Sequence, residues 1–214
     1  MCSYMINRFM NKKIYELLKY TKTSNSQYKG KCWDTGYHTI TVDGIVYEGQ
    51  RKPAERLKDI PYDFADKSVL DIGCNQGGML FELKDKISNG VGVDYDYKLV
   101  NCANKIKSYQ DLNHLNFFVH DLDKDPLDNL NYYNNNEKYD IVFLLAVCVW
   151  IKNWKELIKW VYNNSDKCLF ETNKNFQKEH IDELKKFYKN IEIIRTQSHD
   201  DSIQKKRQLL LCIK

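Results

Sequence analysis

The chain has 214 residues, of which 43% are hydrophobic and 13% aromatic, a composition that suits one folded globular domain and argues against wholesale disorder. Its 33 basic and 29 acidic residues leave a net charge of only +4. This balance is compatible with RNA or another anionic partner, but it does not by itself predict one.

The cysteines and the apolar segments indicate an intracellular protein. The seven cysteines are Cys2, Cys32, Cys74, Cys102, Cys148, Cys168 and Cys212. They include no Cys-x-x-Cys pair and lie mostly inside apolar runs, which favours reduced core thiols over a zinc site or a disulfide framework. No secretory stretch opens the sequence, and no segment approaches the roughly 18 apolar residues of a membrane span. We therefore expect a cytoplasmic protein with no metal site and no membrane association.

The N-terminal residues are expected to form a helix followed by a hairpin. Apolar side chains recur at helical spacing across residues 4–20, which predicts an amphipathic helix. Residues 37–49 alternate in hydrophobicity around an Asp-Gly dipeptide, which is favoured in a two-residue hairpin turn. Pro53 is placed to open a short helix after the hairpin. Residues 1–60 are thus expected to be a cap or a platform for the rest of the chain.

From residue 67 onward, apolar runs typical of buried strands alternate with segments of helical periodicity. The expected strands are residues 68–73, 90–94, 116–121, 139–150, 167–172, 191–197 and 207–213. The expected helices are residues 78–87, 97–108, 154–161 with Asn153 as a candidate cap, and 181–187, whereas the asparagine-rich residues 128–140 are expected to be a loop. Strands that are apolar on both faces indicate a parallel sheet covered on both sides. The predicted fold over residues 61–214 is therefore an α/β domain with a mostly parallel seven-stranded sheet and a C-terminal antiparallel hairpin.

The stretch LDIGCNQGG, at the carboxyl end of the first of these strands, indicates a ligand close to the backbone. A dinucleotide is one candidate, because Gly73 and Gly78 match the outer glycines of G-x-G-x-x-G and Asp94 is the expected downstream acid. The middle position is Asn75, however, and Asp71 puts a carboxylate where a pyrophosphate would be repelled. A nicotinamide-dependent oxidoreductase is therefore the weaker alternative.

S-adenosylmethionine suits the same acids better, because it lacks phosphate and carries a sulfonium and an ammonium. Asp71 is placed to lower the potential around the cationic methionine part, Asp94 to accept from the ribose hydroxyls, and Asp121 to accept from the adenine amino group. These acids end three consecutive predicted strands, so we expect them at one edge of the sheet. Agreement among separate segments is more informative than the glycine stretch alone.

The segments VLDIGCNQGG, GVGVDYD, FFVHDL and YDIVFLLAVCVWI, with the closing hairpin, resemble the successive motifs of class I, Rossmann-like S-adenosylmethionine-dependent methyltransferases. The resemblance covers roughly residues 60–214 and implies that fold and that cofactor. The cofactor-binding residues that it implies are Asp71, Gly73, Cys74, Asn75 and Gly77 for the methionine portion, Asp94 and Tyr95 for the ribose, and Asp121 and Leu122 for the adenine. Asn75 departs from the glycine that many members have there, although some branches carry GCN-x-G.

Two branches of the family are similar to different parts of the chain. Residues 139–154 resemble RNA methylphosphate-capping methyltransferases, whereas residues 38–73 resemble wobble-uridine tRNA methyltransferase relatives and many small-molecule methyltransferases. The methyl acceptor, an oxygen or a nitrogen, therefore stays open between RNA and a small molecule or sugar. A methyltransferase-like binding module without catalysis is the alternative to an enzyme.

Few catalytic residues are expected, because methyl transfer from a sulfonium mainly requires alignment and exclusion of water. Trp150 is a candidate to stack a base or sugar or to cover the sulfonium, and His38 is a candidate base. Arg56 or Arg51 is a candidate partner for the methionine carboxylate. Glu171 is expected either to face the substrate or to form a cap or a salt bridge. The structural alternatives are a rim tryptophan, a hydrogen-bonded hairpin histidine and a surface arginine that caps a strand or pairs a glutamate.

Overall fold

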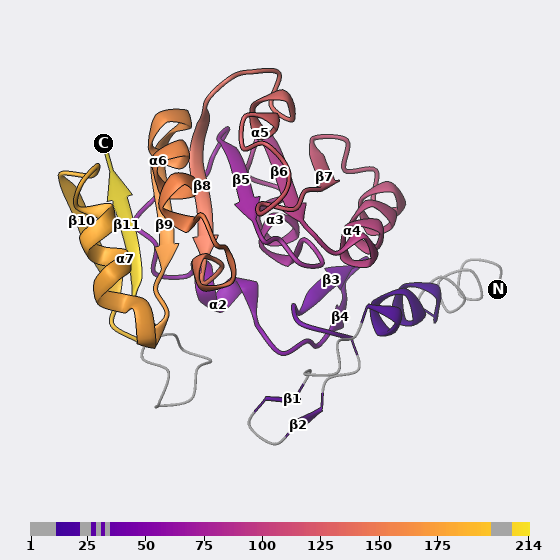
Figure 1. Cartoon of the computed structure of the whole chain (residues 1–214). Helices are drawn as coiled ribbons and strands as arrows, with labels where there is room; N and C mark the ends of the chain where they lie inside the picture. Colours follow the sequence, from indigo (N-terminus) through magenta and orange to yellow (C-terminus); the bar gives the residue numbers. More distant parts are fainter. Residues whose placement is uncertain (1–11, 22–26, 29–30, 33–34, 198–206) are drawn as a thin grey trace, which may run out of the picture.

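A seven-stranded sheet forms the centre of the computed structural model, which describes residues 12–21, 27–28, 31–32, 35–197 and 207–214 (Figure 1). Its strands are β5 (Ser68–Ile72), β6 (Asn89–Asp94), β7 (Leu115–Val119), β8 (Tyr139–Leu145), β9 (Ser165–Glu171), β10 (Asn190–Arg195) and β11 (Leu209–Ile213). Their order across the sheet is β10-β11-β9-β8-β5-β6-β7, and neighbouring strands are parallel except where β11 runs antiparallel to β9 and β10. The mostly parallel sheet with a C-terminal hairpin, predicted from the sequence, is confirmed.

Strand β8 shows why the sheet is buried on both faces. Ile141 and Phe143 pack into the hydrophobic cluster on one face, whereas Val142 and Leu144 pack into the cluster on the other. All four side chains are fully buried. An interior parallel strand covered on both sides is apolar at successive positions, and this is the pattern that the sequence shows.

Helices cover both faces of the sheet (Figure 1). On one face lie α3 (Gly78–Leu83) and α4 (Tyr97–Tyr109), and on the other lie α6 (Trp154–Asn164) and α7 (Gln177–Leu184). A short helix, α5 (Asn129–Tyr132), corrects the loop expected in the asparagine-rich stretch, because the buried Leu130 anchors one helical turn there. The turn after α5 contains Asn135 and Asn136, which adopt left-handed conformations that asparagine tolerates.

The N-terminal layer packs on the α3 side of the sheet. Residues 12–20 are helical, which confirms the described part of the helix expected at 4–20. The predicted hairpin is confirmed as β3 (Ile40–Val42) and β4 (Ile45–Tyr47), and its turn residues Asp43 and Gly44 have positive φ angles, +50° and +75°. The helix α2 (Pro53–Leu57) then opens at Pro53 as expected. Residues of this layer share one hydrophobic core with α3.

The remaining short elements are β1 (Gln27–Tyr28) paired with β2 (Lys31–Cys32), and the 3-10 turns η1 (Cys148–Trp150) and η2 (Lys174–Phe176). Five cysteines among the described residues are free and buried. Within the described ranges, no helix combines the length and the apolar character that crossing a membrane requires. Residues 4–11 of the helix expected at 4–20 lie outside the described residues.

Candidate active site

The turn that follows β5 has three left-handed residues at alternate positions. Gly73, Asn75 and Gly77 have φ angles of +75°, +53° and +78°. Glycine adopts this conformation without strain, and asparagine is among the few other residues that tolerate it. The side-chain oxygen of Asn75 also accepts a hydrogen bond from the Gln76 amide at 3.0 Å. Asn75 therefore preserves the turn at the position where the sequence departs from the expected glycine.

Asp94, the last residue of β6, holds this turn in place. Its carboxylate accepts hydrogen bonds from the amides of Asn75, at 2.9 Å, and Asp96, at 3.0 Å. The side chain is buried, and burial raises the pKa of Asp94 while the two amide donors oppose the rise. The carboxylate is thus oriented at the strand end before any ligand arrives.

Asp71 lies in β5 and is only 2% exposed. Its Oδ2 atom has no hydrogen-bond partner among the described residues. Burial raises the pKa of Asp71 to about 7; Arg56 opposes this rise, and the negative charge of Asp94 adds to it. A buried carboxylate with an unused oxygen is costly unless a cation or a donor approaches it. Asp71 is therefore placed to receive a cation or a hydrogen-bond donor.

An ion network lies next to Asp71, at the carboxyl ends of β5 and β9. Arg56, on α2, binds the Glu171 carboxylate through a 2.7 Å contact between Nη2 and Oε2. Nη1 of Arg207 is 3.5 Å from the same oxygen. All three side chains are largely buried. Of the roles expected for Glu171, the structure shows the salt bridge.

Asp121 is placed differently from the other two acids. Strand β7 ends at Val119, which pairs with Asp94, so Asp121 belongs to the loop beyond the strand. Its carboxylate binds Lys124 Nζ at 2.7 Å and accepts from the Asp123 amide at 3.1 Å. The hydrogen bond from Lys124 is the main cause of its lowered pKa. Asp121 is thus an ionised, partly exposed group on the loop next to Asp94.

Among the other expected site residues, Cys74 and His38 are buried, whereas Tyr95 is exposed. Cys74 lies in the core with a protonated thiol, because burial raises its pKa and the nearby Asp71 and Asp94 raise it further. Only its backbone can line the turn. The ring of His38 is 3% exposed and packs against Gly78, where an added Cβ would approach the His38 Cβ to 2.4 Å. Tyr95, in contrast, is 75% exposed just after Asp94.

Gln76, which the sequence reasoning did not single out, fixes the N-terminal layer on the glycine turn. Its side chain is fully buried, and its amide group donates to the Thr35 carbonyl at 3.2 Å and to the Thr21 hydroxyl. Its side-chain oxygen accepts from the Tyr37 amide at 3.2 Å. The signal in the sequence was a large polar amide inside a turn otherwise made of small residues.

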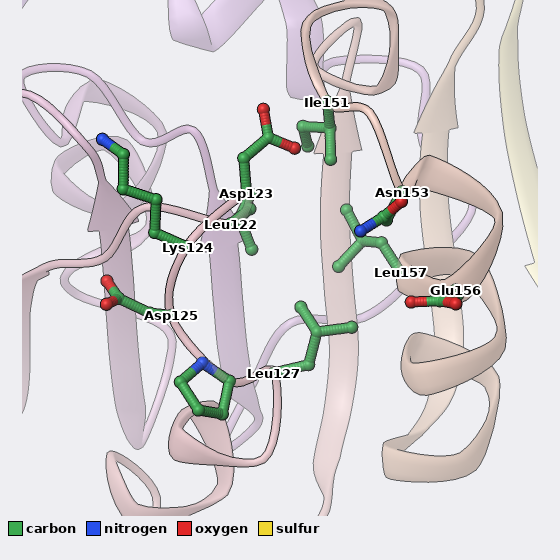
Figure 2. A pocket seen from close by; sticks show the side chains of 10 residues that line it. Leu122, Asp123, Lys124, Asp125, Leu127, Ile151, Asn153, Glu156 and Leu157 are labelled. Atoms are coloured by element: carbon green, nitrogen blue, oxygen red, sulfur yellow. The ribbon is translucent and has the colours of Figure 1, made fainter.

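A hollow of about 270 Å³ lies between the loop after β7 and the start of α6. Figure 2 shows the side chains that line it. Its lining consists of Leu122, Asp123, Lys124, Asp125, Pro126, Leu127, Ile151, Asn153, Glu156 and Leu157. Oδ1 of Asp123 accepts from the Lys152 amide at 2.8 Å and joins the two walls. Trp150 immediately precedes this wall and is 81% exposed. In the part of the chain that is described, no group of three or more His, Cys, Asp or Glu side chains is placed to hold a metal.

Comparison with known sequences gives a family and one distant relative. A family model described as a methyltransferase domain matches residues 46–198. The U6 snRNA methylphosphate capping enzyme Amus of Drosophila melanogaster is 30% identical over 126 residues, a match that covers 49% of this chain and 40% of that protein. The chain therefore matches less than half the length of this relative.

Comparison with solved structures gives neighbours with the same fold. The N-terminal domain of EvdMO1, crystallised with SAH bound, has a TM-score of 0.68 and 12% identity, covering 97% of this chain and 96% of that one. Magnesium protoporphyrin IX methyltransferase (ChlM) from Synechocystis PCC 6803, with bound SAM, has a TM-score of 0.55 and 17% identity, covering 71% of this chain and 72% of that one. At such identities the similarity concerns the fold, and it agrees with the class I topology of the sheet.

Proposed function

Because the chain belongs to the family of methyltransferase domains, we propose that it binds S-adenosylmethionine at the ends of β5, β6 and β7 and transfers the methyl group to an oxygen or nitrogen acceptor. The observation that carries the proposal is the buried Asp71, whose Oδ2 has no hydrogen-bond partner among the described residues. S-adenosylmethionine supplies the missing positive charge, because it carries a sulfonium and an ammonium. Two structural neighbours hold SAH or SAM, which supports this choice of cofactor.

The residues around the turn fit the other parts of the cofactor. The left-handed turn at Gly73, Asn75 and Gly77 provides backbone without bulky side chains. The Asp94 carboxylate already accepts two amide donors, and its remaining lone pairs can accept from the ribose hydroxyls. The loop after β7 offers Asp121 to the adenine amino group.

Bound S-adenosylmethionine supplies an electrophilic methyl group, and the chain's own residues orient it and exclude water. Gln76 holds the N-terminal layer against the glycine turn and thereby closes that side of the site. Arg56 is proposed to attract the methionine carboxylate while its Nη2 stays on Glu171. Trp150 and His38 remain the candidate residues on the acceptor side. Because His38 is buried, an acceptor that has already lost its proton suits the site better than one that needs a base.

The acceptor is proposed to be RNA in preference to a small molecule or sugar. The similarity to a U6 snRNA methylphosphate capping enzyme supports this choice, since that relative is named for an RNA. The similarity covers about half of this chain, so it supports a class of acceptor and not a particular RNA.

Calorimetric titration with S-adenosylmethionine and with its demethylated product tests the cofactor. We expect both to bind the wild-type protein and the Asp85→Asn variant, whose carboxylate is exposed and lies outside the strand ends. Asp71→Asn should bind at least about tenfold more weakly, because it removes the negative charge that faces the cation. Failure of the folded wild-type protein to bind either compound would overturn the proposal. Binding without transfer of a labelled methyl group to any component of a cell extract would indicate a binding module.

A further inference from the structure

Two aromatic side chains are exposed at the carboxyl ends of the adjacent strands β8 and β9. Trp150, the last residue of η1, is 81% exposed, and Phe176, the last residue of η2, is 42% exposed. Leu145, which ends β8, pairs with Glu171, which ends β9. Each ring lies five residues beyond the end of its own strand, so the two loops that carry the rings leave the sheet at neighbouring points.

A buried histidine ties the two loops together. The His180 ring is stacked on Phe176, with 6.1 Å between centroids, and meets Trp154 edge-on at 4.9 Å. Trp154 begins α6, four residues after Trp150 in the sequence. His180 itself is 1% exposed and also packs on Phe170 of β9. The loop that carries Phe176 is therefore held against the start of the helix that follows Trp150.

The sheet order separates this pair of rings from the expected nucleoside end of the cofactor. Strands β8 and β9 lie on one side of β5, whereas β6 and β7, which carry the ribose and adenine candidates, lie on the other side. The methyl group is expected near β5, so an acceptor that approaches it across the ends of β8 and β9 passes Trp150 and Phe176.

We propose that Trp150 and Phe176 form a stacking platform for a nucleobase of the methyl acceptor. This inference rests on the proposed function, and it identifies a nucleobase as the group that the acceptor side of the site recognises. Aromatic side chains bind bases through their π-faces, and such stacking tolerates any base. An exposed tryptophan is otherwise unfavourable in contact with water, because most of its surface is apolar. A base within RNA and a base in a free nucleotide offer the same ring, and the experiment separates these sources.

The test measures transfer of labelled methyl groups to intact cellular RNA and, in a second arm, to the same RNA digested to nucleotides. The variants are Trp150→Ala, Trp150→Phe and Phe176→Ala. Tyr132→Ala is the matched control, because Tyr132 is 66% exposed on α5, at the opposite end of the sheet (Figure 1). Calorimetric titration with the demethylated cofactor accompanies each variant.

We expect Trp150→Ala to raise the acceptor concentration for half-maximal labelling by about tenfold or more, and Phe176→Ala to raise it by less. Trp150→Phe should retain most of the wild-type affinity, and Tyr132→Ala should behave as wild type. Affinity for the demethylated cofactor should stay within about twofold in all variants. Label in the intact arm alone would identify RNA as the source of the base, and label in the digested arm would identify a nucleotide.

Two results would overturn the inference while leaving the proposed binding of S-adenosylmethionine intact. One is a wild-type protein that binds the cofactor but labels neither arm. The other is a Trp150→Ala variant that loses cofactor affinity as much as acceptor affinity, since Trp150 would then belong to the cofactor site. Absence of cofactor binding by the wild-type protein would instead overturn the proposed function, and the platform with it.

Discussion

Asp71 is a carboxylic acid inside the core. Its ionisation lowers the free energy of unfolding, and a cationic ligand next to the carboxylate offsets this loss. Its pKa is about 7 in the folded protein, against 3.8 for the unperturbed group, because burial disfavours the charged form. The folded state thus binds this proton more tightly than the unfolded state does. The stability that the protonated group provides is complete below about pH 4 and is lost as the pH rises towards 7.

We therefore predict that Asp71→Asn stabilises the cofactor-free protein at pH 8, by an amount on the order of 3 kcal/mol, while weakening cofactor binding. Thermal unfolding of the wild type and the variant at pH 5 and pH 8 measures this effect. The gain in melting temperature should be larger at pH 8. A variant less stable than the wild type at pH 8 would show that the Asp71 charge is already compensated without a ligand.

His180 should affect stability in the opposite direction. Its ring is enclosed by Trp154, Phe170 and Phe176, and burial lowers its pKa from 6.5 to about 4. The unfolded state therefore binds the proton more tightly, and the contribution of the neutral ring is present above pH 6.5 and lost as the pH falls towards 4. His180→Phe, which keeps a ring in contact, should flatten the fall in melting temperature over this range. The comparison belongs in an Asp71→Asn background, because Asp71 changes stability in the opposite sense over the same pH values.

Among the elements, the turn between β5 and α3 makes the sharpest demands on residue type. A Cβ at Gly77 would lie 2.6 Å from the Phe117 ring, and the residue has a positive φ angle of +78°. Gly77→Ala should therefore lower the free energy of unfolding by about 2 kcal/mol or more and abolish cofactor binding. Asn75→Gly is the control: it keeps the left-handed conformation, and we expect stability within about 1 kcal/mol of the wild type. Chemical denaturation measures the free energy of unfolding of both variants. Equal losses of stability in Gly77→Ala and Asn75→Gly would contradict this explanation of the turn.

The attachment of the N-terminal layer depends on one side chain of that turn. Gln76 makes hydrogen bonds to Thr21, Thr35 and Tyr37, so Gln76→Ala should release the layer without disturbing the sheet. We expect faster amide hydrogen exchange across residues 37–51 and unchanged exchange in β8. Gln110→Ala is the matched control, because the side-chain oxygen of Gln110 accepts a hydrogen bond from Lys84 Nζ away from the turn. Unchanged exchange in residues 37–51 would show that the apolar core alone holds the layer.

At the scale of the whole molecule, the sequence predicted what depends on local periodicity. The long apolar run of β8 and the strand–helix alternation identified the fold class, and the Asp-Gly turn at Asp43 identified the first hairpin. The three strand-end acids were placed on adjacent strands, although Asp121 lies beyond the end of its strand. These features could be predicted because each arises from neighbours in sequence.

What the sequence did not predict depends on contacts between distant residues. Arg56 and Glu171 form a buried ion pair between segments that no periodicity connects. The burial of His38 against Gly78 and the contacts of Gln76 likewise follow from how the N-terminal layer packs. The helix α5 appears in the asparagine-rich stretch because tertiary burial of Leu130 outweighs a weak local preference.

Strand β11 follows β10 in the chain, yet it lies between β10 and β9. During synthesis, β10 leaves the ribosome before the strand that must join it to the sheet, so the edge of the sheet can be completed only after residues 209–213 have emerged. Replacing Leu211 with proline would consequently detach both β10 and β11 from the sheet, although Leu211 itself lies only in β11. The nascent chain carries an unfinished sheet edge, exposed to other chains, for as long as that interval lasts.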